Sequence, residues 1–288
     1  MLSQEIIKTY NISSSKYGEG NTANSNKTPI GVHIIKEKYG KKTNGEARLG
    51  LTRMDQVLRA EEVFFFESFE SELQALKDRK PIQYVVGYTY FHGLKIGLNS
   101  STLIPRPETE ELVSEVVKLI DDTQAKSVID LGTGSGCIAL AIKNIRPDID
   151  VVGFDINPDA IDQARKNADT LELDVNFIVA DLFEYSFESA DIIVSNPPYI
   201  PVSECKDMEE HVMAYEPEGA LFVPDNKPLL FYDAIFALGK KIFMNRRGWL
   251  AFEIHHLFGE EMKLLGVKHC AKEVKLIQDL QGKDRMLL

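Results

Sequence analysis

The amino-acid sequence predicts an α/β fold in which helices cover both faces of a largely parallel sheet. From about Lys126 onward, short runs rich in β-branched residues alternate with stretches of helical periodicity, which is the pattern of strands joined by crossover helices. A glycine-rich loop follows the first of these strands directly. The chain has 288 residues, 44% of them hydrophobic, which is enough for one large domain and a smaller second one.

The strands and helices of the larger domain can be placed from their patterns. The expected strands are residues 127–131, 151–155, 175–179, 191–195, 249–254, 272–277 and 285–288. The expected helices are residues 108–120, 137–145, 159–170, 229–243 and 257–265. Pro107 fits the first turn of the earliest helix, and Glu108 and Glu110 lie where the helix dipole favours negative charge. Residues 91–98 are expected to form a strand or hairpin arm that leads into it.

The first part of the chain follows a different pattern. We predict an amino-terminal, mainly helical region over residues 1–85 and the α/β domain over residues 86–288. Apolar residues recur at helical spacing within residues 46–80, at Met54, Val57, Leu58, Phe65, Phe69, Leu73 and Leu76. Residues 11–45 are instead rich in Ser, Asn, Gly and Lys, which is typical of a flexible surface loop.

Composition and charge argue against several classes of protein. Lys and Arg number 33 against 44 Asp and Glu, and the resulting net charge of −11 argues against nucleic-acid phosphates as the main binding partner. The cysteines Cys137, Cys205 and Cys270 form no C-x-x-C pair, which argues against a disulfide framework and against a zinc or other metal site. No long apolar segment predicts secretion or membrane insertion, so the expected location is the cytoplasm.

The tetrapeptide Asn196-Pro197-Pro198-Tyr199 carries the predicted chemistry. An amide or ring NH2 has a delocalised lone pair, so it attacks a methyl donor only when the site aligns it and accepts its N–H bonds. The side-chain oxygen of Asn196 can accept one N–H and the carbonyl of Pro197 the other. Consecutive prolines stiffen the loop, and Tyr199 can stack on a flat substrate group or wall it in. Alone, the tetrapeptide also fits an ordinary proline-rich strand exit.

The loop Asp130-Leu131-Gly132-Thr133-Gly134-Ser135-Gly136 indicates the donor site. Such loops suit both dinucleotides and S-adenosylmethionine, so the spacing decides. The Asp-x-Gly-x-Gly-x-Gly pattern lacks the Gly-x-Gly-x-x-Gly spacing of nicotinamide enzymes, and Asp130 suits a cationic donor with a free ammonium group. With the tetrapeptide, the loop predicts methyl transfer from S-adenosylmethionine to a planar nitrogen, with S-adenosylhomocysteine as product.

Two further acids lie at the ends of expected strands. Asp155 ends the second strand, where its carboxylate can accept hydrogen bonds from both ribose hydroxyls of the donor. Asp181 follows the third strand, where it could meet the adenine amine while Leu182 and Phe183 cover the ring. Single acids at strand ends are often helix caps or solvated side chains, and this alternative stays open for both residues.

From about Lys80 to its carboxyl terminus, the chain resembles the bacterial peptide chain release factor glutamine methyltransferases, the PrmC/HemK family. Besides the glycine-rich loop, the resemblance rests on Pro81-Ile82-Gln83-Tyr84-Val85-Val86-Gly87, Leu103-Ile104-Pro105-Arg106-Pro107-Glu108-Thr109-Glu110, Asn196-Pro197-Pro198-Tyr199-Ile200-Pro201, Tyr215-Glu216-Pro217 and Phe252-Glu253-Ile254. It implies a class I, Rossmann-like methyltransferase fold with a seven-stranded, mostly parallel sheet. It also implies methyl transfer to the side-chain amide nitrogen (N5) of the Gln in the Gly-Gly-Gln loop of class 1 release factors.

The resemblance also implies where the two substrates bind. It assigns catalysis to Asn196, Pro197, Pro198 and Tyr199, and donor binding to Gly132, Thr133, Gly134, Ser135, Gly136, Asp155, Leu182 and Asn196. The chemistry of the loop and of the strand ends adds Asp130 and Asp181 to the expected donor-binding residues. Arg106 and Glu108 are expected to shape the pocket floor or to form an ion pair at the helix entry. Family members usually begin with a helical domain that contacts the release factor. Segments of residues 16–33 resemble instead a fragment of an L,D-transpeptidase-type domain, but without its nucleophilic Cys.

We expect a direct in-line displacement without a covalent enzyme intermediate and without a catalytic histidine, so His255 and His256 are assigned structural or solvated positions. The partner is expected to be a release factor and the protein a monomer. One alternative is methylation of a ribosomal protein Gln. Another is an amino-methyltransferase that flips adenine or cytosine into the same slot. A third is a binding protein that keeps the fold without the chemistry.

Overall fold

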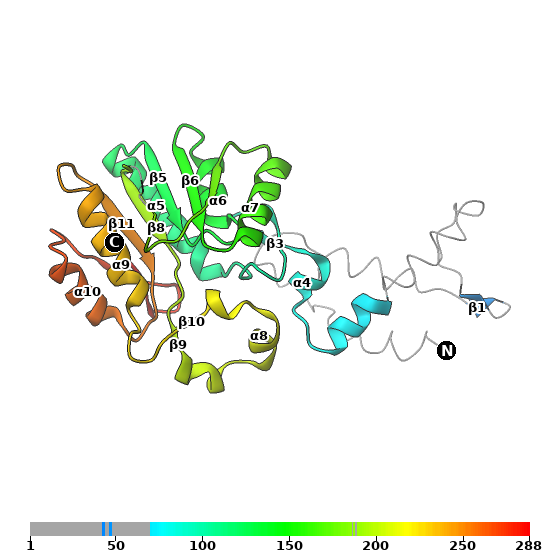
Figure 1. The fold of residues 1–288 in the computed structure, drawn as a ribbon. Helices are drawn as coiled ribbons and strands as arrows, with labels where there is room; N and C mark the ends of the chain where they lie inside the picture. Colours follow the sequence, from blue (N-terminus) through cyan, green and yellow to red (C-terminus); the bar gives the residue numbers. More distant parts are fainter. Residues whose placement is uncertain (1–41, 44–45, 48–69, 186, 188) are drawn as a thin grey trace. The chain divides into compact units, whose positions relative to one another are not determined.

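A computed structural model shows how the chain folds (Figure 1). The structure describes residues 42–43, 46–47, 70–185, 187 and 189–288. Contacts between residues divide the chain into two compact units, Met1–Glu72 and Leu73–Leu288. Within the first unit, β1 (Lys42–Thr43) pairs antiparallel with β2 (Glu46–Ala47), so residues 46–47 are extended. The rest of the loop-like segment and most of the expected amino-terminal helices lie outside the described residues.

The second unit is built around a seven-stranded sheet with the order β12-β13-β11-β8-β5-β6-β7 (Figure 1). The mutually parallel strands are β11 (Trp249–Glu253), β8 (Ile192–Ser195), β5 (Ser127–Leu131), β6 (Asp150–Asp155) and β7 (Asn176–Val179). At one edge, β13 (Asp284–Leu287) and β12 (Leu276–Gln278) pair antiparallel. The predicted mostly parallel α/β sheet is confirmed.

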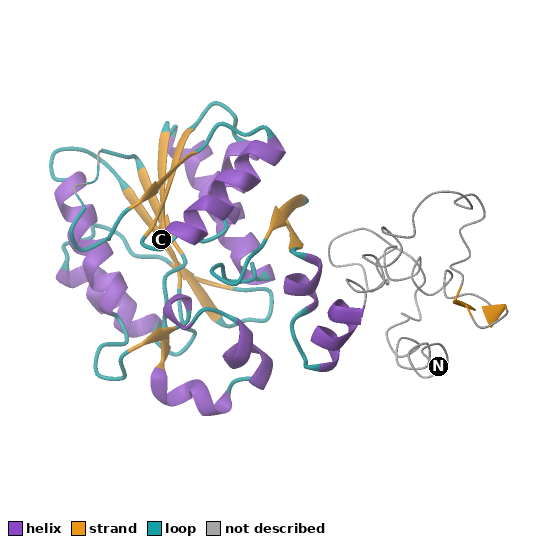
Figure 2. Ribbon diagram, turned by 45° about the vertical axis from the view of Figure 1, so that its right-hand side comes forward, coloured by secondary structure: helices purple, strands orange, loops and turns teal. Residues whose placement is uncertain are grey.

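Helices cover both faces of this sheet, as Figure 2 shows. The longer helices are α5 (Pro107–Thr123), α6 (Cys137–Ile145), α7 (Pro158–Leu171), α9 (Leu230–Ile242) and α10 (Gly259–Lys268). Successive strand residues point to opposite faces, so Val128 belongs to the core under α5, α6 and α7, and Ile129 to the core under α9 and α10. None of the helices in the described part of the chain is long and apolar enough to cross a membrane.

Most expected elements start and end within a few residues of the observed ones, and the last long connection differs most. The strand expected at residues 272–277 begins only at Leu276. Lys275 nevertheless exchanges both backbone hydrogen bonds with Leu288, at N···O distances of 2.7 and 2.8 Å. The exposed charges of Lys272 and Glu273 lie before this point, outside the sheet.

The strand or hairpin arm expected at residues 91–98 is a hairpin of β3 (Tyr88–Phe91) and β4 (Leu94–Gly97). His92 and Gly93 form its two-residue turn with φ values of 49° and 79°. Positive φ at both positions gives a turn whose twist matches that of the paired strands. Glu110 of α5 fixes this turn, because its carboxylate accepts a hydrogen bond from the His92 N–H at 3.0 Å.

Several short elements were not expected from the sequence. They are α4 (Ile82–Val86), β9 (Ile200–Pro201), η2 (Val202–Asp207), α8 (Glu210–Tyr215), η3 (Glu218–Ala220) and β10 (Phe222–Val223). All but α4 lie between β8 and α9, where β9 pairs parallel with β10. Elements of this length span too few residues to show a hydrophobic period.

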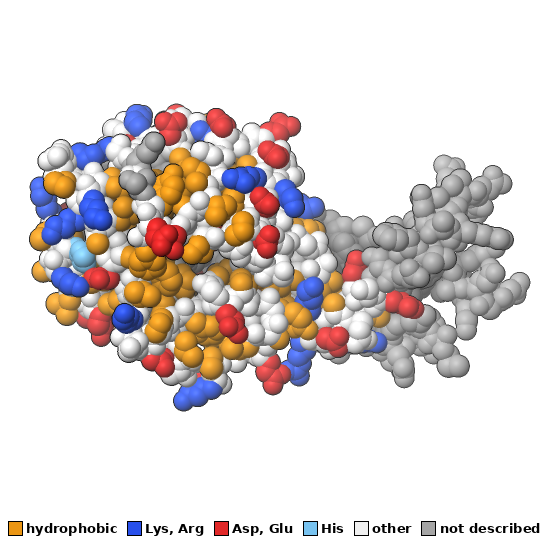
Figure 3. Space-filling view, viewed as in Figure 1, with side chains coloured by type: hydrophobic (Ala, Val, Ile, Leu, Met, Phe, Trp, Pro, Cys, Tyr) orange, Lys and Arg blue, Asp and Glu red, His pale blue; other side chains and the backbone are white. Residues whose placement is uncertain are grey.

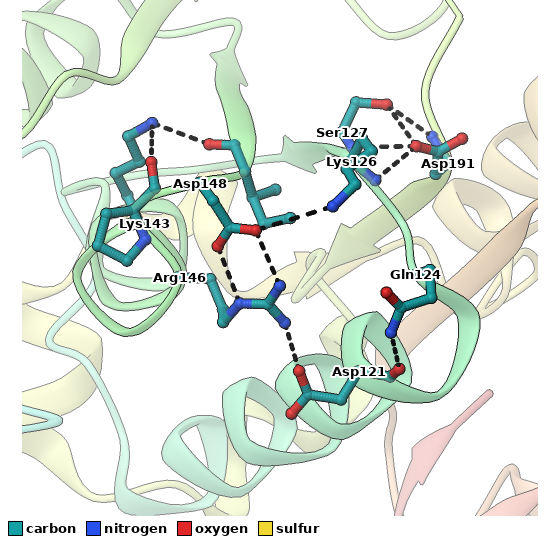
Figure 4. Close-up of polar contacts among 10 residues, drawn as sticks. Asp121, Gln124, Lys126, Ser127, Lys143, Arg146, Asp148 and Asp191 are labelled. Atoms are coloured by element: carbon teal, nitrogen blue, oxygen red, sulfur yellow. Dashed lines mark hydrogen bonds and ion pairs between the residues drawn. The ribbon is translucent and has the colours of Figure 1, made fainter.

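Polar contacts close the amino-terminal edge of the sheet (Figure 4). One carboxylate oxygen of Asp191 accepts hydrogen bonds from the backbone N–H groups of Lys126 and Ser127, at 2.7 and 3.1 Å. Nearby, Arg146 forms ion pairs with Asp121 of α5 and with Asp148. These residues satisfy exposed backbone groups and link helices, and they occupy the edge opposite to the glycine-rich loop.

Asn167 on α7 ties the β3–β4 hairpin to the sheet. Its side chain is buried, its Oδ1 accepts a hydrogen bond from the Gly97 N–H at 2.9 Å, and its Nδ2 donates to the Gly97 and Ser135 carbonyls at 3.0 and 2.8 Å. One amide therefore holds an arm of the hairpin and the glycine-rich loop together. A Cβ at Gly97 would lie 2.7 Å from Gln163 Nε2 and 2.8 Å from Asn167 Oδ1, so a larger residue there would displace these side chains.

Replacing Asn167 with Ala should lower the free energy of unfolding by roughly 2–4 kcal/mol, because the buried Ser135 carbonyl and two partly buried backbone groups of Gly97 lose their partner. Urea unfolding followed by circular dichroism measures this. Asn176→Ala, at an exposed position of β7, is the matched control and should change stability by less than about 0.5 kcal/mol. Equal effects of the two substitutions would contradict the role assigned to Asn167.

Candidate active site

The strand register brings most of the predicted site residues to one edge of the sheet. Leu131 of β5 pairs with Phe154 of β6 and with Ser195 of β8, and Ser195 also pairs with Phe252 of β11. The next residue of each strand or loop therefore lies at the same level: Gly132, Asp155, Asn196 and Glu253. Ligands of open α/β sheets bind at this carboxyl-terminal edge.

The glycine-rich loop turns sharply between β5 and α6. Gly132, Gly134 and Gly136 have φ values of 72°, 54° and 81°, in the left-handed region that favours glycine. A Cβ at Gly136 would lie 2.8 Å from the ring of Phe177, whereas Cβ atoms at Gly132 and Gly134 would meet nothing within 4 Å. The loop is therefore packed at its far end and leaves open space over Gly132 and Gly134.

Asp130 lies beneath this loop and is fully buried. Its Oδ2 accepts hydrogen bonds from Thr133 Oγ1 at 2.6 Å and from the Ala139 N–H at 3.3 Å. Its Oδ1 is buried without any hydrogen-bond partner. Loss of solvation raises the pKa of this carboxyl to about 7, although both hydrogen bonds favour the charged form.

Asp155 faces the loop from the end of β6. One carboxylate oxygen accepts the Gly134 N–H and the other the Asn157 N–H, both at 2.9 Å. Burial raises the pKa of Asp155, and the backbone hydrogen bonds oppose this rise. Each oxygen keeps a second lone pair, so Asp155 can support the loop and still accept hydroxyl donors.

Asp181 lies two residues beyond the end of β7, at the same edge of the sheet. Its Oδ1 accepts a hydrogen bond from the Phe183 N–H at 2.8 Å, which is a local turn contact and not the helix cap that the sequence left open as an alternative. Leu182 is half-buried, and the Phe183 side chain is 56% exposed. The Phe183 ring lies 6.0 Å from that of Phe231, between ring centroids, and its exposed part is available to cover a flat ligand.

Asn196 follows β8 and is held from the side. Its Nδ2 donates a hydrogen bond to Thr109 Oγ1 at 3.2 Å, and Thr109 Oγ1 donates to Glu253 Oε2 at 2.6 Å. Thr109 and Glu253 are both buried, on α5 and at the end of β11. Neither was among the predicted site residues, although both lie within the segments that carry the family resemblance.

Tyr199 ends the tetrapeptide with its hydroxyl group fixed. The hydroxyl donates to the second oxygen of Glu253 at 3.0 Å, and burial raises the pKa of Tyr199. The Tyr199 ring meets His255 edge-on, with ring centroids 6.0 Å apart. His255 Nδ1 accepts the Leu257 N–H and its Nε2 contacts Glu204 at 3.1 Å, so His255 has the structural position that was expected.

Arg106 forms its ion pair with a distant residue. Its guanidinium lies 2.5 Å from Glu216 Oε1, and Glu216 Oε2 accepts the Ile104 N–H at 3.3 Å. The alternative of a helix-entry pair between Arg106 and Glu108 is therefore replaced by a link to the segment before β10. The Glu216 side chain is 1% exposed, so this pair holds the chain after α8 against the approach to α5.

The residues at this edge fit S-adenosylmethionine. The open space over Gly132 and Gly134 leaves room for a ligand against the backbone. The unpartnered Asp130 Oδ1 is a buried acceptor, and a donor molecule that carries a sulfonium and an ammonium group would favour the charged form of this carboxyl. Glycine-lined loops with a buried acid below them therefore suit this cation better than a dinucleotide pyrophosphate.

Comparison with known proteins defines the class first. A family model described as the methyltransferase small domain matches residues 109–222. The catalytic domain of hMettl16, solved with a MAT2A 3′UTR hairpin, shares the fold with a TM-score of 0.53 at 14% identity, covering 68% of this chain and 75% of that one. The fold and the loop make this chain a class I methyltransferase, a class that uses S-adenosylmethionine.

Closer relatives define the family. The release factor glutamine methyltransferase of Flavobacterium psychrophilum is 42% identical over 224 residues, covering 76% of this chain and 78% of the relative. The protein of the same name from Staphylococcus aureus is 31% identical over 267 residues, covering 89% of this chain and 95% of the relative. The chain belongs to the family of release factor glutamine methyltransferases.

Asp130→Asn should change how stability depends on pH. The pKa of about 7 in the folded protein lies above the value of roughly 3.9 for an unfolded Asp. The free energy of unfolding of the wild type therefore falls as pH rises between these values. Asn does not ionise. The free energy of unfolding of the variant, relative to that of the wild type, should therefore rise by up to roughly 3 kcal/mol from pH 4.5 to pH 8. Urea unfolding of the ligand-free proteins at both pH values measures the difference, and a pH-independent difference would refute it.

Proposed function

We propose that this chain transfers a methyl group from S-adenosylmethionine to the side-chain amide nitrogen of the Gln in the Gly-Gly-Gln motif of class 1 release factors. The observation that carries the proposal is the position of Asn196, whose NH2 is bonded to Thr109 and whose oxygen takes no hydrogen bond from any residue that the structure describes. The names of the relatives support the same acceptor. We place the activity in the cytoplasm and assign it to a monomer.

The donor would be held at the ends of β5, β6 and β7. Gly132 to Gly136 would take its methionine end, with Thr133 and Ser135 completing the loop and Asp130 Oδ1 facing the positive charge. Asp155 would accept the ribose hydroxyls, and Asp181 with Leu182 would contact the adenine. When bound, S-adenosylmethionine supplies an electrophilic methyl group on a sulfonium centre.

The acceptor amide would be aligned by the tetrapeptide. Asn196 Oδ1 accepts one N–H of the Gln amide and the Pro197 carbonyl accepts the other, which fixes the nitrogen in line with the methyl group. Pro198 keeps the loop extended, and Tyr199, with its hydroxyl group bonded to Glu253, walls the slot. The nitrogen becomes acidic only as the new bond forms, so its proton can pass to water without a histidine base.

A nucleic-acid base is the main competing acceptor. The net charge of −11 disfavours it, and Figure 3 shows hydrophobic side chains over the middle of the face viewed, with no continuous basic patch among its described residues. The likeness to the hMettl16 domain is at 14% identity and concerns the fold alone. A ribosomal protein Gln remains a second protein acceptor to test.

Methyl-labelled S-adenosylmethionine, offered with a release factor, ribosomal proteins or DNA, tests the proposal. Label should appear on the release factor and be lost when its Gly-Gly-Gln glutamine is replaced. Asn196→Ala should lower kcat by about 100-fold or more while donor affinity changes only a few-fold. Asn176→Ala serves again as control. Label on DNA or on ribosomal protein alone, or normal turnover by Asn196→Ala, would overturn the proposal.

A further inference from the structure

We infer that Thr109 and Glu253 are positioning residues that fix which end of the Asn196 amide faces the acceptor. The inference rests on the proposed function, because it deepens the role of Asn196 there. Three hydrogen bonds carry it: Asn196 Nδ2 to Thr109 Oγ1, Thr109 Oγ1 to Glu253 Oε2, and Tyr199 OH to Glu253 Oε1.

The polarity of this chain of bonds follows from counting hydrogens. A carboxylate only accepts hydrogen bonds, so both oxygens of Glu253 need donors. A hydroxyl has one hydrogen, and Thr109 places its hydrogen on Glu253 at 2.6 Å. The lone pairs of Thr109 Oγ1 are then left for Asn196, and only the NH2 end of the amide can donate to them. Asn196 Oδ1 must therefore point the other way.

Burial of Thr109 and Glu253 stabilises this orientation of the Asn196 amide. Thr109 and Glu253 are each 2% exposed, so water cannot replace a lost partner for either group. Burial raises the pKa of Glu253, while the hydrogen bonds from Thr109 and Tyr199 favour its charged form. Turning the Asn196 amide over would place its oxygen against the Thr109 oxygen, which has no hydrogen left to give.

This orientation of Asn196 would make the acceptor site at the tetrapeptide selective for a nitrogen that carries hydrogens. With Oδ1 turned outward, Asn196 can bind an amide NH2 and repels a carboxylate or carbonyl oxygen at the same point. Among the residues that the structure describes, none donates a hydrogen bond to this oxygen. An amide turned over would meet the Gln NH2 with its own NH2 and lose the alignment for transfer.

The three partners come from separate parts of the fold. Thr109 lies in the first turn of α5, Glu253 ends β11, and Tyr199 belongs to the same loop as Asn196. Glu253 lies next to Asn196 because Phe252 and Ser195 pair in the parallel register. One buried carboxylate therefore orients both ends of the tetrapeptide, directly through Tyr199 and through Thr109 at Asn196.

Two substitutions of Thr109 distinguish the role of its hydroxyl group from that of its packing. Thr109→Val keeps the shape and removes the hydroxyl, and should lower kcat for Gln methylation by about 10- to 100-fold with donor affinity within twofold. Thr109→Ser keeps the hydroxyl and should recover most of the activity. Thr123→Val removes a hydroxyl group at the other end of α5 and should keep normal kcat. Glu253→Gln should also lower kcat, because one of its side-chain atoms then donates.

A second readout does not depend on the acceptor. In protein labelled with 15N-Asn, the Asn196 side-chain NH2 signals, assigned by their loss in Asn196→Asp, should shift in Thr109→Val and stay in place in Thr109→Ser and Thr123→Val. Unchanged signals in Thr109→Val, or Thr109→Ser as inactive as Thr109→Val, would overturn the inference. If the wild type methylates no Gln, the proposed function fails and these signals alone decide the role of Thr109.

Discussion

The parallel pairing of β5 with β6 and β8, and of β8 with β11, is the constraint on which the site depends. This register makes four strands end at one level, so residues far apart in the sequence emerge side by side. Acids and an amide that would be solvated at a loop tip are instead held by backbone N–H groups and buried hydroxyls. The opposite edge is closed by the polar contacts of Asp191 and Arg146.

The sequence predicted the middle of the sheet well because the central strands β5 and β8 are buried on both faces. Ile192, Ile193 and Val194 are fully buried, and such continuous apolar runs between turns are easy to recognise. The short pair of β9 with β10 could not be predicted, since a parallel bridge of two residues leaves no period and Pro201 argues against a strand. The start of the antiparallel edge strand β12 was predicted too early, because the residues before it are exposed and charged and do not join the sheet.

The predicted site was incomplete for a different reason. Asp155 and Asn196 could be proposed as site residues from their places after strands, because a suitable side chain and a suitable position coincide there. Thr109 and Glu253 could not, since a Thr in a first helical turn and a Glu at a strand end have many ordinary uses. Their role depends on a contact between residues far apart in sequence, which only the fold supplies. The same holds for the ion pair of Arg106 with Glu216.

The segment between Tyr199 and Phe222 gives the two sides of the site unequal resistance to local opening. Its regular structure consists of short helical turns and the two-residue pairing of β9 with β10, whereas the glycine-rich loop is backed by the central strands and by Asn167. Elements with few buried contacts open at a lower free energy than the global one. Amide hydrogens should therefore exchange faster between Tyr199 and Phe222 than in the strands behind the glycine-rich loop, so one wall of this sheet edge can loosen while the other keeps its shape.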